Sequence, residues 1–439
     1  MQQPGLETRE IRSIQVWQKT LKALWARERG ERSLSNRSSA WYLAYFPSGV
    51  AFSILGVLIP LYLIEELQGS LLDLGVMTCA ATLALIPASV YLGRLPDRYS
   101  RSKPFILTSY LSAGLILVLM SRTRSVPLFQ VLYVAMNIVN YLAGPSTSIL
   151  IAESYERKKW GKVMARRSFT DGLAQALGLG VCTLTANSLG YSTLLSLTPP
   201  LVFLSLIIAF LTIHDPPIYV ERFLGRVERP VEDLETLSYH MTSRGGVTRP
   251  RYGSLSLAGE PRMSMFGIGM ALFTFAASNA FTSLPIYLKS KADFSSSLVF
   301  GIFFARSLVG TFSYLVISSF AREGGGSAVK ISAAGRAILI LLLSLIPTLV
   351  MPFSAILTIA LLSAIASCYS LYSLGCEVVT VQNAGSSGLG VYDALSSIGS
   401  SAGGFIGGAM PLLIGFPPLF ALSSILFLTA TLSFISSRV

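Results

Sequence analysis

The chain has 439 residues, of which 52% are hydrophobic and only 13% charged, and its mean hydropathy is +0.61. Soluble domains carry about 25% charged residues, so this composition excludes an ordinary soluble protein. The net charge of +12 could suit a nucleic-acid-binding protein, but the positions of the basic residues in the chain indicate a membrane protein without a nucleic-acid partner.

Residues 1–40 precede the first long apolar run and form an arm rich in arginine and lysine. Apolar and aromatic residues recur in this arm at helical spacing: Ile11, Ile14, Trp17, Leu21, Leu24 and Trp25. This pattern, with basic residues between them, predicts an amphipathic helix lying on the inner leaflet of the bilayer. A regulatory or docking role for the arm is the alternative.

Apolar runs near 20 residues recur through the rest of the chain, which is the length that crosses about 30 Å of hydrocarbon. We expect twelve transmembrane helices at 41–64, 71–93, 104–121, 127–151, 163–187, 193–213, 264–288, 296–320, 328–348, 352–376, 388–412 and 416–436. The polar segment 214–263 separates the first six from the last six and is expected to be a cytoplasmic linker. The predicted domains are therefore a bundle at 41–213 and a bundle at 264–439.

Basic residues indicate the orientation in the membrane. With both termini inside, 28 of the 34 lysines and arginines fall in cytoplasmic segments and four in outside loops. Cytoplasmic loops of membrane proteins carry this excess. The protein is therefore expected to be a multi-pass protein of the cell membrane with cytoplasmic N- and C-termini.

A short charged loop lies between the second and third predicted helices. Its sequence, G-R-L-P-D-R-Y-S-R, spans residues 93–101. It resembles the G-x-L-A-D-R-x-G-R-K loop of the major facilitator superfamily, since Gly93, Leu95, Asp97, Arg98 and Arg101 match that pattern. Pro96, Ser100 and Ser102 depart from it.

The two halves of the chain also resemble each other. Residues 60–63 (PLYL) end the first predicted helix, and residues 285–288 (PIYL) end the seventh. The superfamily is built from two parallel six-helix repeats. The resemblance therefore implies an all-α polytopic fold of twelve transmembrane helices in two pseudo-symmetric six-helix bundles.

The resemblance also implies a role for the charged loop. In the family, the loop carboxylate, here Asp97, faces the start of the eleventh helix in the outward-open state. The equivalent of Arg101 pairs with an acid at the inner end of the fourth helix, here Glu153. Gly93, Asp97, Arg98, Arg101 and Glu153 are thus expected to form a conformational latch. The alternative is a turn that only sets topology.

Ionisable residues inside membrane spans are costly and are functional candidates. Asp171, Arg306, Asp393 and Glu377 are the coupling or ion-pair candidates. Since the fifth and eighth helices meet between the halves in the family, Asp171 and Arg306 could pair there. Asp171 or Asp393 could instead bind a coupling proton, and a static ion pair that fixes packing is also open. Glu377 could line a gate.

The family resemblance implies a substrate cavity lined by the first, fourth, seventh and tenth helices. The candidate residues there are Tyr45, Ser53, Asn137, Asn140, Tyr141, Asn279, Thr282, Tyr369 and Tyr372. Each asparagine could alternatively make a hydrogen bond between helices. This set lacks the arginine cluster that a phosphate carrier would need, and it fits a small neutral, zwitterionic or amphipathic molecule.

The sequence contains no nucleotide-hydrolysis motif and no metal-ligand pattern, so we expect neither an enzyme nor a cofactor or metal site. The expected function is secondary active transport of a small organic solute by alternating access, coupled to protons, by a monomer. Uptake and efflux are both open. The alternative is a transporter-like sensor or scaffold that does not transport.

Overall fold

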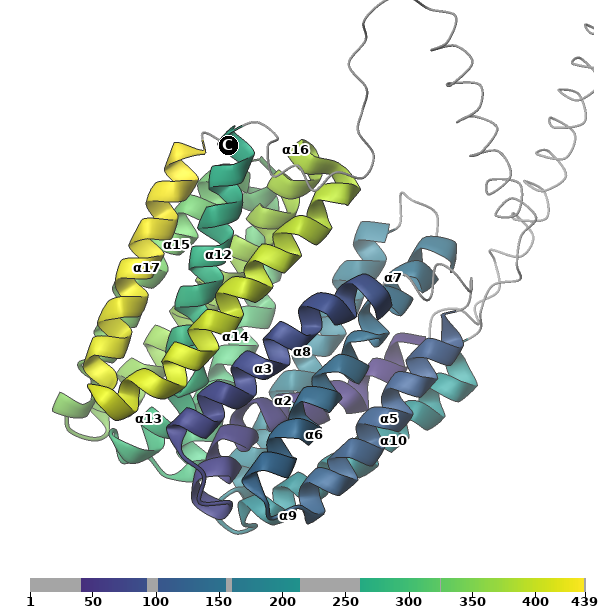
Figure 1. Cartoon of the computed structure of the whole chain (residues 1–439), viewed down its shortest axis with the longest axis vertical. Helices are drawn as coiled ribbons and strands as arrows, with labels where there is room; N and C mark the ends of the chain where they lie inside the picture. The colour runs from purple at the N-terminus through teal and green to yellow at the C-terminus, as the bar shows by residue number, and fades with distance from the viewer. Residues whose placement is uncertain (1–40, 93–101, 155–159, 214–260, 324, 438–439) are drawn as a thin grey trace, which may run out of the picture.

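The computed structural model describes residues 41–92, 102–154, 160–213, 261–323 and 325–437, and all the regular structure in these residues is helical (Figure 1). The first half comprises a 3-10 turn η2 (Trp41–Ala44), α2 (Tyr45–Leu61), a π-helical turn η3 (Tyr62–Glu66), α3 (Leu71–Leu92), α5 (Lys103–Arg122), α6 (Val126–Tyr141), α7 (Ala143–Ser154), α8 (Trp160–Thr185), α9 (Tyr191–Ser196) and α10 (Thr198–Thr212). The second half comprises α12 (Pro261–Thr282), α13 (Leu284–Ser290), α14 (Ser296–Glu323), α15 (Gly325–Leu343), a 3-10 turn η5 (Ile346–Thr348), α16 (Phe353–Leu413) and α17 (Phe416–Ser436). Ten of these helical segments are long and apolar enough to cross a membrane.

Prolines start several of these helices. The first turns of α5, α6, α10, α13 and α17 contain Pro104, Pro127, Pro199, Pro285 and Pro417, respectively. Because the first-turn N–H groups of a helix have no helical partner, a proline there loses no hydrogen bond. Two of these prolines, Pro199 and Pro285, begin a second helix inside a predicted span: Leu197 separates α9 from α10, and Ser283 separates α12 from α13.

The tenth and eleventh predicted helices are joined in one helical element, α16, of 61 residues. A straight helix of this length would measure about 90 Å, roughly three times the hydrocarbon thickness. Its first part runs antiparallel to α15, because Gly325 contacts Gly375 at one end of α15 and Arg336 contacts Ile365 further along it.

The later part of α16 runs in the opposite direction. Gly399 lies against Ala271 of α12, and Gly407 lies against Asn279, so this part is parallel to α12. Since α12, α14 and α15 alternate in direction, α12 and α15 point the same way. The element therefore reverses between its two parts, and each part is one of the two predicted crossings.

The helices form two bundles, one from each half of the chain, which lie side by side (Figure 1). They meet along two seams of small residues, one between α3 and α16 and the other between α8 and α14. A Cβ at Gly408 would lie 2.4 Å from the carbonyl oxygen of Leu71, and one at Gly172 would lie 2.3 Å from Oγ1 of Thr311. Only glycine leaves room at these positions, for the backbone of Leu71 in one seam and for the side chain of Thr311 in the other.

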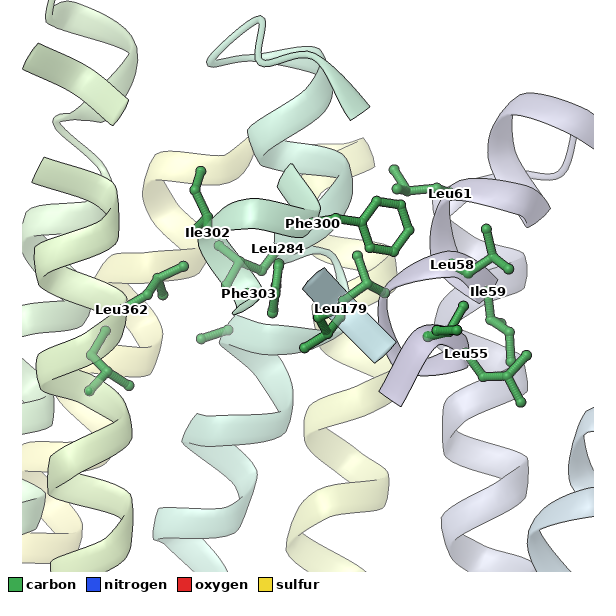
Figure 2. Packing of buried hydrophobic residues seen from close by; sticks show 14 of the residues in the cluster. Leu55, Leu58, Ile59, Leu61, Leu179, Leu284, Phe300, Ile302, Phe303 and Leu362 are labelled. Carbon is green, nitrogen blue, oxygen red and sulfur yellow. The ribbon is translucent and has the colours of Figure 1, made fainter. Parts of the chain in front are cut away.

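Apolar side chains fill the space between the bundles at one end of these seams. In Figure 2, Leu58 and Leu61 of α2, Leu179 of α8 and Phe300 of α14 belong to one cluster of buried residues. The nearby hydroxyls of Tyr191 and Ser296 are 2.6 Å apart, and the backbone N–H of Ser297 donates to Oδ1 of Asn187 at 3.1 Å. The two halves are thus in direct contact at this end.

Candidate functional site

Arg336 of α15 extends into the second bundle and is 2% exposed. Its guanidinium carbon is 5.1 Å from the ring centroid of Phe273 on α12, 5.6 Å from that of Phe427 on α17 and 5.2 Å from that of Tyr369 on α16. Nε and Nη2 each donate to the carbonyl of Ile365 over 3.4 Å. Nη1 has no hydrogen-bond partner. Aromatic faces and one carbonyl thus stabilise the charge, while one donor stays unused.

Small residues of α15 allow this helix to pack closely against α16 beside Arg336. The Ser332 hydroxyl donates to the carbonyl of Cys368 at 2.6 Å, and a Cβ at Gly335 would lie 3.3 Å from the Cys368 sulfur. These contacts bring α15 close to the first part of α16. The long side chain of Arg336 can therefore extend past α16 to the rings of α12 and α17.

A second arginine, Arg306 of α14, approaches the same rings. Its guanidinium carbon is 4.9 Å from the centroid of Phe281 and 5.6 Å from that of Phe303. The guanidinium carbon of Arg336 is 5.7 Å from the same Phe281 ring. Nε of Arg306 has no hydrogen-bond partner. The two guanidinium groups therefore share one aromatic ring and each has an unused N–H group.

The charges around this pair are unbalanced. The titratable groups that act electrostatically on Arg336 are Arg306, Tyr369, Cys368 and Tyr372, and the group that acts on Arg306 is Tyr369. None of these is a carboxylate. Among the described side chains, two positive charges therefore lie near each other in the membrane interior without a negative partner.

Tyr369 forms the accessible edge of this site. It is 46% exposed, although Leu362, Ile365, Tyr372 and Cys376, which lie on the same face of α16, are all buried. This face is directed toward the protein interior, since Ile365 and Tyr369 both contact Arg336. The exposed ring of Tyr369 therefore lies on the helix face that carries the contacts to Arg336. Tyr372 is stacked on Phe273, with centroids 3.5 Å apart.

The first bundle holds a second polar cluster. Arg167 and Asp171 of α8 are 3.7 Å apart, one helical turn from each other. The guanidinium of Arg167 also lies 5.1 Å from the centroid of Tyr45, whose hydroxyl hydrogen-bonds Thr147. This cluster joins α2, α7 and α8 around one carboxylate and one guanidinium.

The expected pair between Asp171 and Arg306 is not formed in this conformation, and the helix register gives the reason. Gly172 faces Thr311, and Gly180 faces Phe304, so α8 and α14 are antiparallel and Arg306 lies level with residues near 178. Asp171 is then about 10 Å away along the helix axis, at 1.5 Å per residue. Its own helix supplies a closer partner in Arg167.

A family model, the Major Facilitator Superfamily, matches residues 41–389. The chain belongs to the Major Facilitator Superfamily. It is therefore a multi-pass membrane transporter, and the two helical bundles are the repeats of that fold. None of the curated protein sequences compared with the chain is similar to it.

Solved transporters of this superfamily share the fold. The nucleoside transporter NupG is 12% identical with a TM-score of 0.69, and the alignment covers 92% of this chain and 99% of NupG. The xylose transporter XylE from E. coli, in a partially occluded inward-open conformation, is 14% identical with a TM-score of 0.63 over 90% of this chain and 97% of XylE. The human organic anion transporter MFSD10 is 16% identical with a TM-score of 0.56 over 91% and 99% of the two chains. At these identities the likeness concerns the fold alone.

Several residues predicted to line the substrate cavity instead make hydrogen bonds or ring contacts inside their own bundle. Asn279 is fully buried and donates to the Ser423 hydroxyl of α17 at 2.7 Å, which is the hydrogen bond between helices held open above. Asn137 donates to the carbonyl of Tyr133 at 2.8 Å on its own helix. Tyr45 and Tyr372 are buried among aromatic rings.

The remaining cavity candidates are partly buried. The hydroxyls of Ser53 and Thr282 each donate to a carbonyl of the preceding helical turn, while Asn140 and Tyr141 lie near the end of α6. Of the nine candidates, Tyr369 alone is exposed, and its ring contacts Arg336.

The other predicted residues lie outside what the structure describes. Gly93, Asp97, Arg98 and Arg101 fall in segment 93–101, so the latch remains a prediction. The helices that carry Glu153, Glu377 and Asp393 are described, but the side chains of these three acids are not.

Sequence reasoning missed Arg336. The expectation of a cavity without an arginine cluster considered only the first, fourth, seventh and tenth helices, whereas Arg306 and Arg336 come from the eighth and ninth. The available signal was a second arginine inside an apolar span that has no acidic residue of its own, since residues 325–343 contain none.

Proposed function

We propose that the protein is a secondary active transporter that moves a small organic solute across the membrane by alternating access, coupled to protons. The contact between the halves at one end of the seams supports this most directly. Tyr191 and Asn187 of the first half contact Ser296 and Ser297 of the second there. Toward the end that carries the C-terminus, the helices of the two bundles diverge in Figure 1.

This arrangement suits one state of a rocking transporter. If the basic residues fix the termini inside, the end in contact is extracellular and the conformation faces the cytoplasm. To reach the opposite state, the two bundles must rotate against each other about the α3–α16 and α8–α14 seams. Glycine contacts between backbones, such as Gly408 with Gly75, allow a pivot without rearranging large side chains.

Asp171 is the candidate for the coupling proton. It lies on α8, which packs against the opposite half, and its pair with Arg167 is local to one helix. A carboxylate that alternately contacts Arg167 and accepts a proton would connect protonation to the α8–α14 seam. Asp393 remains an alternative, and so does the conformational latch of Asp97 with Glu153.

The test is transport by the purified protein in liposomes. A thermal-shift screen against metabolites and lipophilic compounds would first find a ligand, because a ligand that binds the folded state raises Tm. Uptake of that ligand into vesicles should then exceed uptake into protein-free vesicles and respond to an imposed pH gradient. Uptake that ignores the gradient would exclude proton coupling.

The second candidate function is a sensor or scaffold with the transporter fold. It predicts ligand stabilisation in the thermal-shift screen together with no net uptake or counterflow in the same preparation. That result would replace the transport proposal.

A further inference from the structure

Resting on that proposed function, the arginine pair identifies the solute class. We propose that Arg306 and Arg336 bind the anionic group of an organic solute, while Phe281 and Tyr369 contact its apolar body. The site lies within the second bundle, between α12, α14, α15 and α16.

The first argument is the missing counter-charge. Arg336 is 98% enclosed by the protein, and its described electrostatic neighbours include Arg306 and no carboxylate. Charged residues inside membrane spans usually pair with one another or line a substrate path. Ring faces compensate a guanidinium charge only in part, and the two arginines also repel each other. An anion between them would supply the charge that the described side chains do not.

The second argument is the donors. Nη1 of Arg336 and Nε of Arg306 both lack a hydrogen-bond partner, and both guanidinium carbons lie near the Phe281 ring, at 5.7 Å and 4.9 Å from its centroid. Guanidinium groups present their N–H donors in a planar fork that fits the oxygens of a carboxylate or phosphate. Two unused donors beside one ring therefore suit one oxyanion group.

The third argument is access and lining. Tyr369 is 46% exposed on an otherwise buried helix face, so part of its ring is free to contact a solute. Arg306 is itself partly exposed, whereas Arg336 lies deeper. The aromatic rings of Phe281, Phe303 and Tyr369 surround the donors. A ligand with an acidic group and a flat apolar body matches this combination better than a polar neutral molecule does.

A carboxylate of the chain itself is the competing explanation. Glu377 follows Tyr369 by two helical turns on α16, about 12 Å along the axis. Asp171 is displaced from Arg306 by a similar distance and contacts Arg167. Variants must therefore distinguish an external anion from Glu377.

The experiment measures binding of matched probes to the full-length protein in detergent. The probes are phenylacetate, phenyl phosphate and the neutral phenylacetamide, which share the aromatic body and differ in charge. Thermal shift and isothermal titration at pH 7.5 should show binding of at least one anion and at least tenfold weaker binding of the amide. Preference for phenylacetate or phenyl phosphate would distinguish a carboxylate from a phosphate ester.

The variants are Arg306→Gln and Arg336→Gln, with Arg122→Gln as the control. Arg122 is exposed at the end of α5, far in sequence from the site. Each site variant should bind the anion at least tenfold more weakly than the wild type. The control variant should bind it with the wild-type Kd. Because Arg306 is partly exposed, we expect Arg306→Gln to fold. This variant can therefore test the proposal even if Arg336→Gln does not fold.

Three results of the binding experiments would overturn the assignment, and one result of transport assays would do the same. The binding results are equal binding of the amide and the anions, wild-type anion affinity in folded Arg306→Gln, or restoration of Arg336→Gln by Glu377→Gln, which would make Glu377 the partner. Transport of neutral solutes with no binding of either anion would also overturn it, while leaving the proposed transport intact. Failure of every ligand in both binding and uptake would instead remove the transport proposal.

Discussion

Single charged residues dominate the chemistry of this transporter, and the two clusters differ in their balance of charge. In the first half Arg167 has a carboxylate 3.7 Å away at Asp171. In the second half Arg306 and Arg336 have aromatic rings instead. A positive charge without a carboxylate lowers the stability of the folded protein, and residues retained at such a cost are commonly functional.

Replacing Arg336 with methionine should therefore stabilise the protein. The Arg336→Met side chain is similar in length and apolar, so it removes the buried charge and keeps contact with the rings. We expect a gain of about 1–2 kcal/mol, net of the lost ring–cation attraction, seen as a higher Tm in detergent. Arg124→Met, at an exposed loop position, should change Tm little. A lower Tm for Arg336→Met alone would show that the guanidinium is well compensated.

The Asp171 carboxylate allows a separate prediction. Asp171→Asn breaks an ion pair whose side chains are 26% and 33% exposed, so the stability change should be about 0.5 kcal/mol or less. If Asp171 carries the coupling proton, uptake by this variant loses its dependence on the pH gradient. Arg167→Gln breaks the same pair and should keep that dependence. Equal behaviour of the two variants would indicate a static pair.

At the scale of helices, contact between backbones holds the halves together. A Cβ at Gly408 would lie 2.5 Å from Cα and N of Gly75 across the α3–α16 seam. Gly408→Ala should therefore separate these helices and destabilise the protein by roughly 1–3 kcal/mol, measured by thermal unfolding.

Gly56→Ala is the matched control, because nothing lies within 4 Å of a Cβ at this position of α2. Alanine is the better helix former, so Gly56→Ala should be neutral or slightly stabilising. Similar destabilisation by both variants would mean that the loss at Gly408 does not come from the seam.

The sequence predicted the positions of the membrane-spanning helices well, but it predicted the contacts between side chains inside the bundles poorly. Apolar length places a helix in the bilayer, so the structure contains all twelve predicted segments, two of them joined in α16. The length of an apolar run does not indicate which face of the helix contacts lipid, because lipid and the protein interior are equally apolar. The sequence therefore left two readings of Asn279 open, a cavity residue or a hydrogen bond between helices, and the structure shows the hydrogen bond to Ser423 of α17. A pair between Asp171 and Arg306 was one of several possibilities, because the register between two helices cannot be read from either helix sequence.

At the scale of the whole molecule, the α8–α14 seam should move during transport. A Cβ at Gly301 would lie 3.1 Å from Cγ2 of Thr183, which is close enough for a disulfide between the halves. Oxidised Thr183→Cys/Gly301→Cys, in a protein whose four native cysteines are replaced by alanine, should lose at least nine-tenths of its uptake and recover it on reduction.

The control cross-link lies within one half. A Cβ at Gly49 of α2 would lie 2.9 Å from Cβ of Ala174 on α8, so Gly49→Cys/Ala174→Cys can join two helices of the same bundle after a small local separation to the roughly 3.5–4.5 Å that a disulfide needs. Uptake should persist in the oxidised control. Full uptake by the oxidised inter-half variant would argue against relative motion of the two halves at this seam.

Orientation is also a property of the whole chain. The excess of arginine and lysine predicts that both termini lie in the cytoplasm. A fluorescent protein fused after residue 439 should fluoresce, whereas a periplasmic alkaline phosphatase fused there should be inactive in a bacterial host. Active phosphatase would reverse the orientation and make the end in contact the cytoplasmic one.

The contact between Tyr191 and Ser296 has a consequence for how readily this transporter changes state. Hydroxyl groups make this contact, supported by the Lys289 ammonium that donates to Ser296 at 2.9 Å. A neutral hydrogen bond contributes only about 1 kcal/mol, which is less than a tenfold change in an equilibrium constant. The Tyr191–Ser296 bond therefore adds little to the closed end, and its loss alone should change the ratio of the two conformations less than tenfold, because the apolar cluster beside it stays in contact.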